Sequence, residues 1–255
     1  MARTKQLMKL SWTKHLASNV LHVALEPVDS NISAISTIFD YIPGQFITLH
    51  FIKNGVEIKR SYSIANAPDQ NSQYIEFAIS YLPEGIASEE IFHMSPGEQV
   101  EISGPAGRLV LLDEHPKRYV LVATGTGVTP YRSMLNKITE ITAKHDTKFL
   151  LLFGIRTPEE CLYGEEFLDF KKNNSNFDVH FYYSRELPKL DSNQNTDHIH
   201  TGYVQTGFNE QLLNPVTDMI YLCGNPNMID EAYALLLEKG FTAKTVRREK
   251  YISSK

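Results

Sequence analysis

The sequence contains little cysteine: Cys161 and Cys223 are its only two, and they lie far apart in the chain. Iron–sulfur clusters and structural zinc sites take about four ligands, so two isolated cysteines exclude a metal centre built from cysteine. A single disulfide could join them, but reduced thiols in the cytoplasm fit so sparse a pattern better. We therefore expect a cytoplasmic protein without a metal site.

Long apolar runs and an excess of positive charge are also absent. No stretch of about 18 consecutive apolar residues occurs, so no membrane-spanning helix is expected. The basic N-terminus lacks the apolar segment of a secretion signal. The net charge of −5 argues against general binding of nucleic acids. With 42% apolar and 22% charged residues the composition is ordinary for a globular protein, and 255 residues allow one large domain or two smaller ones.

Up to about Leu112 the sequence predicts β-structure, because short runs rich in branched and aromatic residues alternate with turn signals. Turns are expected at Pro43-Gly44, Asn54-Gly55, Pro68-Asp69 and Pro96-Gly97, which suit a sharp reversal of the chain. Many strands at short spacing favour a small antiparallel barrel or sandwich. The expected strands include residues 20–25, 46–51, 74–79 and 100–102.

After Leu112 the sequence predicts strands that alternate with helices. Tyr119 to Ala123 is a continuous apolar run, as expected of a parallel strand buried on both faces. Thr129-Pro130 suits a helix start, and apolar residues follow at helical spacing as far as Ile141. The Asn- and Asp-rich segment 187–202 is expected to be a loop. Further strands at residues 149–153, 179–183 and 219–223, and a helix at 226–239, predict a doubly wound parallel sheet.

Arg60-Ser61-Tyr62-Ser63 stands at the end of an expected strand and allows two interpretations. It is an exposed β-strand, or it is part of a cofactor site. In the second case Arg60 pairs with a pyrophosphate, Tyr62 lays its ring on a flat cofactor, and Ser63 offers a hydroxyl to a ring heteroatom.

The glycine-containing segment Gly125-Thr126-Gly127-Val128-Thr129-Pro130 follows an expected strand and opens a helix. A tight strand-to-helix turn is one explanation. The other is close approach of the backbone to a nucleotide pyrophosphate, which the positive end of the helix also attracts. The segment lacks the three-glycine dinucleotide fingerprint, so an ordinary Rossmann dehydrogenase is not favoured.

Two further segments follow expected strands of this second half. Tyr183-Ser184-Arg185-Glu186 places an arginine where a protein can bind the 2′-phosphate that distinguishes NADP from NAD; simple solvation of the side chain is the alternative. In the second segment, residues 223–228, Cys223 could be a small core residue and Pro226 the start of a helix.

Taken together, these segments resemble the ferredoxin–NADP reductase family over roughly Pro43 to Tyr251. The family patterns are P-G-Q-F/Y at 43–46, R-x-Y-S/T at 60–63, G-x-x-S/T at 85–88, G-P-x-G at 104–107, G-T-G-x-x-P at 125–130, S-R-E at 184–186, and C-G-x-P-x-M at 223–228. The segment Glu249-Lys250-Tyr251 resembles the family's terminal acid-x-aromatic element. Tyr203 is a departure, because bacterial members often carry an arginine there.

The resemblance implies a two-domain α+β protein. Residues 1–112 would form an antiparallel β-barrel that binds FAD, and residues 113–255 a doubly wound parallel α/β domain that binds NADP(H). The implied FAD-binding residues are Arg60, Tyr62, Ser63, Gly85, Ala87 and Ser88. Those implied for NADP(H) are Thr126, Gly127, Thr129, Pro130, Cys223, Gly224 and Met228, with Arg156, Ser184 and Arg185 at the 2′-phosphate. Ser63, Cys223, Glu249 and Tyr251 are the implied catalytic residues.

The activity implied by the resemblance is transfer of a hydride between NADPH and FAD and of single electrons to a ferredoxin or flavodoxin. No such carrier domain fits in the remaining length, so we expect a separate carrier protein and a monomeric reductase. The basic residues Lys244, Arg247, Arg248 and Lys250 are its expected docking site. The alternatives are an NAD(P)H–flavin or quinone reductase, the reductase component of an oxygenase, and a regulatory FAD-binding module without turnover.

Overall fold

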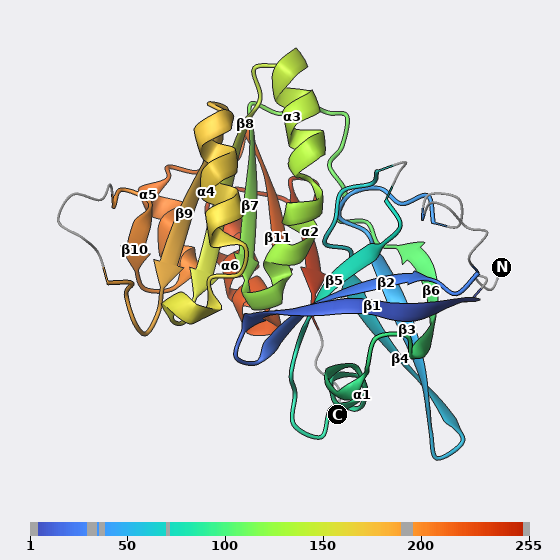
Figure 1. Ribbon diagram of the computed structural model, residues 1–255. Coiled ribbons are helices and arrows are strands. Elements are labelled where there is room, and N and C mark those ends of the chain that lie inside the picture. Colours follow the sequence, from blue (N-terminus) through green and yellow to red (C-terminus); the bar gives the residue numbers. More distant parts are fainter. Residues whose placement is uncertain (1–4, 30–34, 36–38, 70–71, 190–195, 252–255) are drawn as a thin grey trace. The chain divides into compact units, whose positions relative to one another are not determined.

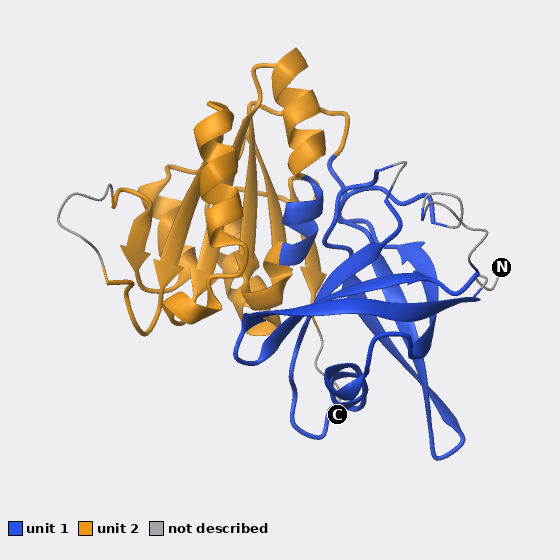
Figure 2. Cartoon of the chain, viewed as in Figure 1, with its two compact units in different colours: residues 1–111, 129–134, 253–255 blue, residues 112–128, 135–252 orange. Residues whose placement is uncertain are grey.

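The chain divides into two compact units, which Figure 2 draws in blue and orange. The computed structural model describes residues 5–29, 35, 39–69, 72–189 and 196–251. Unit 1 comprises Met1–Leu111, Thr129–Met134 and Ser253–Lys255, and unit 2 comprises Leu112–Val128 and Leu135–Ile252. The short segment Thr129–Met134 therefore belongs to unit 1, although the chain on either side of it belongs to unit 2. None of the helices in the described residues combines the length and apolar character needed to cross a bilayer.

Unit 1 is a six-stranded antiparallel sheet with the strand order β4-β3-β6-β1-β2-β5 (Figure 1). An antiparallel bridge between Ile64, just after β4, and Phe77 in β5 connects the two edges, so the sheet curls into a barrel. The elements of unit 1 are β1 (Lys5–Ala17), β2 (Val20–Pro27), β3 (Phe46–Lys53), β4 (Val56–Ser63), β5 (Ile75–Ser80), α1 (Ile86–His93), β6 (Gln99–Ala106) and α2 (Thr129–Ser133).

The period-2 pattern of the strands builds the core of unit 1. Met8 and Leu10 in β1, and Ile47 and Leu49 in β3, are all almost fully buried at alternate positions, while their neighbours face outward. The β3–β4 hairpin turns at Asn54-Gly55, where both residues have positive φ (52° and 74°), as a two-residue type I′ turn requires. This turn therefore forms where the sequence predicts it.

Unit 2 is a six-stranded parallel sheet with the strand order β10-β9-β8-β7-β11-β12. Helices α3 and α4 cover the face of the sheet that is nearer the viewer in Figure 1. The connections β7–α3–β8 and β8–α4–β9 move toward one edge of the sheet, whereas β11–α6–β12 moves toward the other edge. Because such connections are right-handed, α6 lies on the opposite face. Its elements are β7 (Arg118–Thr124), the 3-10 helix η2 (Gly125–Val128), α3 (Leu135–Lys144), β8 (Lys148–Ile155), η3 (Pro158–Glu160), α4 (Gly164–Asn173), β9 (Phe177–Tyr183), β10 (Ile199–Thr201), η4 (Val204–Thr206), α5 (Gly207–Glu210), β11 (Asp218–Gly224), α6 (Pro226–Glu238) and β12 (Val246–Lys250).

The strand order of unit 2 reverses between the neighbouring strands β7 and β11. In open parallel sheets this topological switch point, at the carboxyl ends of the strands, is where ligands bind. The glycine segment that begins at Gly125 and the segment Cys223-Gly224 are the carboxyl ends of these two strands. The fold thus brings together two of the motifs identified in the sequence.

The predicted fold class, an antiparallel barrel followed by a doubly wound parallel sheet, is confirmed, with three local differences. The helix expected from Thr129 is broken at Met134 into α2 and α3, because the first part packs in unit 1 and the second in unit 2. The segment expected to be a loop contains the edge strand β10; residues 190–195 lie outside the described residues. The basic C-terminal segment forms the edge strand β12.

Candidate functional site

The flavin-type motif occupies the end of β4 in unit 1. Strand alternation places Arg60 and Tyr62 on the same face. The Tyr62 ring packs against Phe77 with 5.2 Å between ring centroids, and burial raises the pKa of its hydroxyl, so the ring stays neutral. Ser63, at the strand end, is buried. Arg60 is thus partly exposed beside a packed aromatic ring. A cofactor that carries both a phosphate and a flat ring needs these two kinds of side chain next to each other.

The segment Gly85–Ser88 forms the start of α1. The Ser88 hydroxyl donates to the carbonyl oxygens of Gly85 and Leu82, both at 2.9 Å, and accepts from the Leu82 N–H at 3.1 Å. Its oxygen therefore closes the turn before the helix. The helix start has no side-chain cap, so the N–H groups of Ile86, Ala87 and Ser88 remain as anion donors. Backbone donors, rather than the Ser88 hydroxyl, are the groups here that suit a phosphate.

The glycine segment of unit 2 is shaped by backbone crowding. A Cβ atom on Gly127 would lie 2.4 Å from the Cys223 carbonyl oxygen and 2.5 Å from the Gly224 Cα, so only glycine allows these two loops to meet. Gly125, in contrast, has a φ of 54°, and a Cβ there would meet no atom within 4 Å. The backbone is therefore closely packed at Gly127 and uncrowded at Gly125.

Thr129 and Pro130 begin α2 and group with unit 1. The Thr129 hydroxyl is buried, and it has no hydrogen-bond partner among the described residues. A buried hydroxyl without a partner costs about 1–3 kcal/mol, so a ligand that bonds to it would be favoured. Thr126, three residues earlier, lies in η2 of unit 2.

Three of the residues implied to be catalytic come together in unit 2. Cys223 in β11 is paired in register with Glu249 in β12, and the Tyr251 N–H donates to the Gly224 carbonyl oxygen at 2.9 Å. Burial, reinforced by the nearby Glu249 carboxylate, raises the pKa of the Cys223 thiol well above its ordinary value, although a hydrogen bond with Tyr251 opposes the shift. Ser63, the fourth, belongs to unit 1. The Cys223 thiol is therefore neutral and fully buried, and it is not activated as a nucleophile.

Gly224 and Met228 complete the switch-point segment of unit 2. Gly224 has a φ of 126°, and a Cβ on it would lie 2.6 Å from the Thr124 carbonyl oxygen. The Asn225 side chain caps α6 by accepting from the Asn227 and Met228 N–H groups. Glycine and cap together turn the chain from β11 into α6.

The residues implied for the 2′-phosphate lie at the carboxyl ends of β8 and β9. The Ser184 N–H donates to the Ile155 carbonyl oxygen at 2.9 Å, and the Arg185 N–H to that of Arg156 at 3.1 Å. This pairing brings the two arginines together at the same edge, with the Arg185 side chain exposed. Arg156, however, forms a bidentate ion pair with Glu160, with both N···O distances 2.7 Å. The Glu160 carboxylate, which competes for Arg156, was not among the residues predicted for this site.

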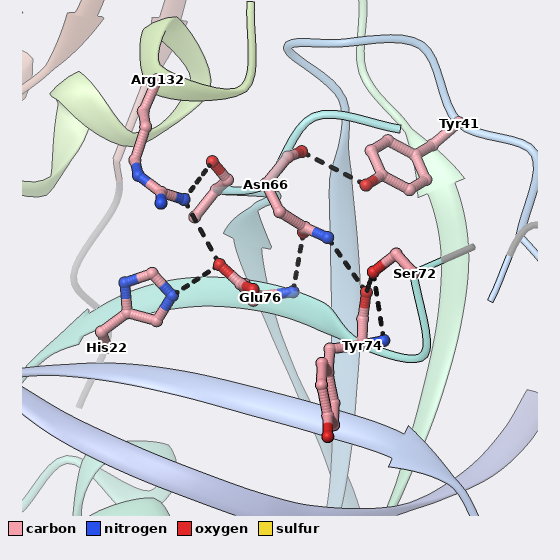
Figure 3. A network of polar contacts seen from close by, with 8 residues as sticks. His22, Tyr41, Asn66, Ser72, Tyr74, Glu76 and Arg132 are labelled. Carbon is pink, nitrogen blue, oxygen red and sulfur yellow. Dashed lines mark hydrogen bonds and ion pairs between the residues drawn. The ribbon is translucent and has the colours of Figure 1, made fainter. Parts of the chain in front are cut away.

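A polar network in unit 1 is the feature that sequence reasoning missed (Figure 3). Glu76 accepts from His22 at 2.9 Å and from Arg132 at 3.3 Å, and Arg132 also donates to the Ala65 carbonyl oxygen at 2.9 Å. His22 lies 54 positions before Glu76 in the chain, and Arg132 lies 56 positions after it. Because no local pattern links them, no sequence signal could have revealed the network.

Comparisons with known proteins match two consecutive regions of the chain. Residues 8–111 match the oxidoreductase FAD-binding domain, and residues 121–233 match the oxidoreductase NAD-binding domain. Ferredoxin--NADP reductase B of Sorangium cellulosum is 30% identical over 220 residues, which cover 84% of this chain and 86% of that protein.

Two further similarities bear on fold and function. Methane monooxygenase component C of Methylosinus trichosporium is 31% identical over 165 residues, 64% of this chain and 46% of that protein, so the match spans less than half of the longer relative. The crystal structure of a ferredoxin NADP+ reductase from Neisseria gonorrhoeae with bound FAD and NADP has the same fold, with a TM-score of 0.79 at 20% identity over 97% of this chain and 99% of that one.

Proposed function

The chain belongs to the ferredoxin–NADP reductase family, and from this membership we propose that it transfers electrons between NADPH and a separate ferredoxin or flavodoxin. Its FAD-binding and NAD-binding domains make it an oxidoreductase. The observation that carries the finer proposal is the similarity to a protein named ferredoxin--NADP reductase over most of both chains. The geometry described above supports the roles of individual residues.

The residues of unit 1 fit FAD. Arg60 would pair with the pyrophosphate, together with the free N–H groups at the start of α1. Tyr62 would lay its ring on the flavin, and Ser63 would donate a hydrogen bond to it. When bound, FAD supplies the chemistry that joins two-electron hydride transfer to one-electron transfer.

The residues of unit 2 fit the nicotinamide coenzyme. The open space at Gly125 and the junction at Gly127 suit a pyrophosphate beside the segment's backbone. Cys223 would lie behind the nicotinamide ring as a neutral, buried thiol, with a hydrogen bond to Tyr251 and the Glu249 carboxylate close by. Hydride transfer requires the two cofactor rings at van der Waals distance, so these residues act by positioning.

Ser184 and Arg185 support a preference for NADPH. Both lie at the end of β9, where a coenzyme of this fold presents its adenine ribose. An exposed arginine is suited to the 2′-phosphate of NADP. Arg156 would strengthen the preference if it were not paired with Glu160.

Replacement of Glu160 by glutamine is expected to lower the KM for NADPH two- to fivefold and to leave the KM for NADH unchanged. The substitution releases Arg156 from an exposed ion pair worth about 0.2–1 kcal/mol. Steady-state kinetics with both coenzymes measure the effect. Glu165→Gln removes an equal charge from the exposed start of α4 and serves as the control. An equal change in both variants, or for both coenzymes, would show that Arg156 does not reach the phosphate.

Alkylation of the native protein is expected to be slow at neutral pH. Burial raises the pKa of Cys161 to about 11 and that of Cys223 well above its ordinary value, and only the thiolate reacts. Labelling of Cys161 by iodoacetamide should therefore rise about tenfold per pH unit and continue to rise beyond pH 9. Mass spectrometry of each labelled cysteine provides the readout. A labelling rate that levels off below pH 9 at either residue would contradict this.

Reduction of the carrier protein is expected to slow as salt concentration rises, because docking relies on local positive charge. Within the expected docking cluster, Lys250 is paired with the Asp230 carboxylate at 2.6 Å. The Arg248 guanidinium lies 3.7 Å from the centroid of the Tyr233 ring, a contact that leaves its positive charge in place. Salt screens such charges over about 8–10 Å. The double variant Arg247→Glu, Arg248→Glu should weaken carrier use and flatten its salt dependence.

The matched control for this charge reversal is Lys144→Glu with Lys172→Glu, on two exposed lysines of unit 2. Reduction of a small neutral acceptor should be unaffected in both double variants. Equal sensitivity to salt for the carrier protein and the small acceptor would rule out docking at this cluster.

A reductase component of an oxygenase is the second candidate, and the similarity to methane monooxygenase component C favours it. One experiment separates the candidates. NADPH and the purified protein are offered ferredoxin, flavodoxin, free flavin and a quinone in parallel. Turnover with ferredoxin or flavodoxin supports the proposal, and turnover with free flavin or quinone alone supports those reductases. If NADPH reduces the flavin but none of these acceptors is used, the result points to an oxygenase partner. If NADPH does not reduce the flavin, the result points to a binding module without turnover.

A further inference from the structure

Three charged or ionisable side chains meet inside unit 1 (Figure 3). His22 in β2, Glu76 in β5 and Arg132 in α2 expose only 6%, 17% and 21% of their side chains. Burial alone would raise the pKa of Glu76, but the hydrogen bond from His22 and the charge of Arg132 outweigh it and lower that pKa. Both partners therefore stabilise the charged form of this half-buried carboxylate, and loss of either removes part of that stabilisation.

The network holds the backbone that follows the flavin strand. Arg132 donates to the Ala65 carbonyl oxygen at 2.9 Å, and the Ala65 N–H donates to the Glu76 carbonyl oxygen at 2.7 Å. The Glu76 N–H in turn donates to the Asn66 side chain at 2.9 Å. Ala65 is two residues after Ser63, so this network fixes the end of the segment implied to hold the flavin.

The same network anchors α2. Besides Arg132, the neighbouring Ser133 hydroxyl accepts from the Gly44 N–H at 3.0 Å. A Cβ on Gly44 would lie 2.5 Å from the Met134 methyl group, so the turn at Pro43-Gly44 packs directly against the end of α2. α2 begins at Thr129, immediately after the glycine segment Gly125–Val128 of unit 2. The coenzyme loop is therefore followed directly in the chain by a segment that packs within unit 1.

We propose that Arg132, Glu76 and His22 are positioning residues for hydride transfer: within unit 1 they hold α2, the segment that directly follows the coenzyme loop in the chain. The proposal rests on the proposed function. None of the three belongs to the motifs of the family resemblance. Arg132 bonds to the barrel, so its loss should affect the alignment of the rings more than the affinity for the coenzyme. A displacement of about 1 Å between reacting groups can slow a reaction about a hundredfold.

The test compares wild type with Arg132→Gln and with the conservative variant Glu76→Gln. The first readout is hydrogen exchange of the α2 amides, which needs no activity. The second is the rate of flavin reduction at saturating NADPH, and the third is the dissociation constant for NADP+. We expect faster exchange in residues 129–134, flavin reduction slowed at least about tenfold, and a dissociation constant within twofold of wild type.

A matched control separates positioning from stability. Arg118 and Asp218 form an ion pair of similar burial inside unit 2, with 25% and 3% of their side chains exposed. Arg118→Gln should lower the melting temperature about as much as Arg132→Gln does, yet leave α2 exchange and flavin reduction unchanged. Arg132→Lys should restore part of the rate, because it keeps the charge.

Unchanged α2 exchange, or an equal loss of rate in Arg118→Gln, overturns the positioning role. A large increase in the dissociation constant with an unchanged maximal rate overturns it as well, because Arg132 would then act in binding. Failure of the proposed function is distinct: neither NADPH nor NADH would reduce the flavin of the wild type, and the positioning role would fall with it.

Discussion

Arg185→Ala is expected to raise the KM for NADPH about 10- to 100-fold while the KM for NADH changes less than twofold. A hydrogen bond to a charged group contributes about 1.5–3 kcal/mol. Only NADPH carries the 2′-phosphate that would accept such a bond from the Arg185 guanidinium. The Arg185 N–H is held by the Arg156 carbonyl oxygen, so truncation of the exposed side chain should not move the loop. Steady-state kinetics with both coenzymes measure the change in preference.

The conservative variant Arg185→Lys provides the control for this prediction. Lysine keeps the charge but loses the two-pronged geometry, so the KM for NADPH should fall between those of wild type and Arg185→Ala. A parallel loss with both coenzymes in Arg185→Ala would mean that the residue maintains the β9 loop and does not read the phosphate.

Gly127→Ala is expected to destabilise unit 2 by about 2–4 kcal/mol and to weaken NADP+ binding at least tenfold. The added Cβ would lie 2.4 Å from the Cys223 carbonyl oxygen and 2.5 Å from the Gly224 Cα, and both atoms are backbone. Such a clash is relieved only by separating the two loops, which costs more than a side-chain rearrangement. Thermal unfolding and titration with NADP+ give the two magnitudes.

Gly125→Ala is the matched control in the same segment. A Cβ there would meet nothing within 4 Å, so the cost is limited to about 1 kcal/mol of strain from its positive φ. Equal destabilisation by the two substitutions would show that backbone conformation, and not the contact between the loops, makes glycine necessary at Gly127.

Local patterns were sufficient to predict much of the fold. The apolar run Tyr119–Ala123 lies within β7, and the turn residues Asn54-Gly55 form the hairpin between β3 and β4. Each depends on neighbours in the sequence, through burial on both faces or through positive φ. The motif at Cys223 was placed correctly at the end of β11 for the same reason.

Features that depend on distant residues could not be predicted. The break between α2 and α3 at Met134 follows from packing against Gly44, about ninety residues earlier, and the helical periodicity runs straight through it. Glu160 forms an ion pair with Arg156 because η3 turns the chain back toward the end of β8. The charged segment from Val246 forms the strand β12 by pairing with β11, and its own sequence does not show an apolar strand pattern.

The claim that this protein passes electrons from NADPH to a carrier protein is tested by the rate at which NADPH reduces purified ferredoxin or flavodoxin in its presence. We expect saturable reduction of at least one carrier, faster with NADPH than with NADH, and loss of the reaction when FAD is removed. An FAD-loaded protein that NADPH reduces but that passes electrons to neither carrier would contradict the claim.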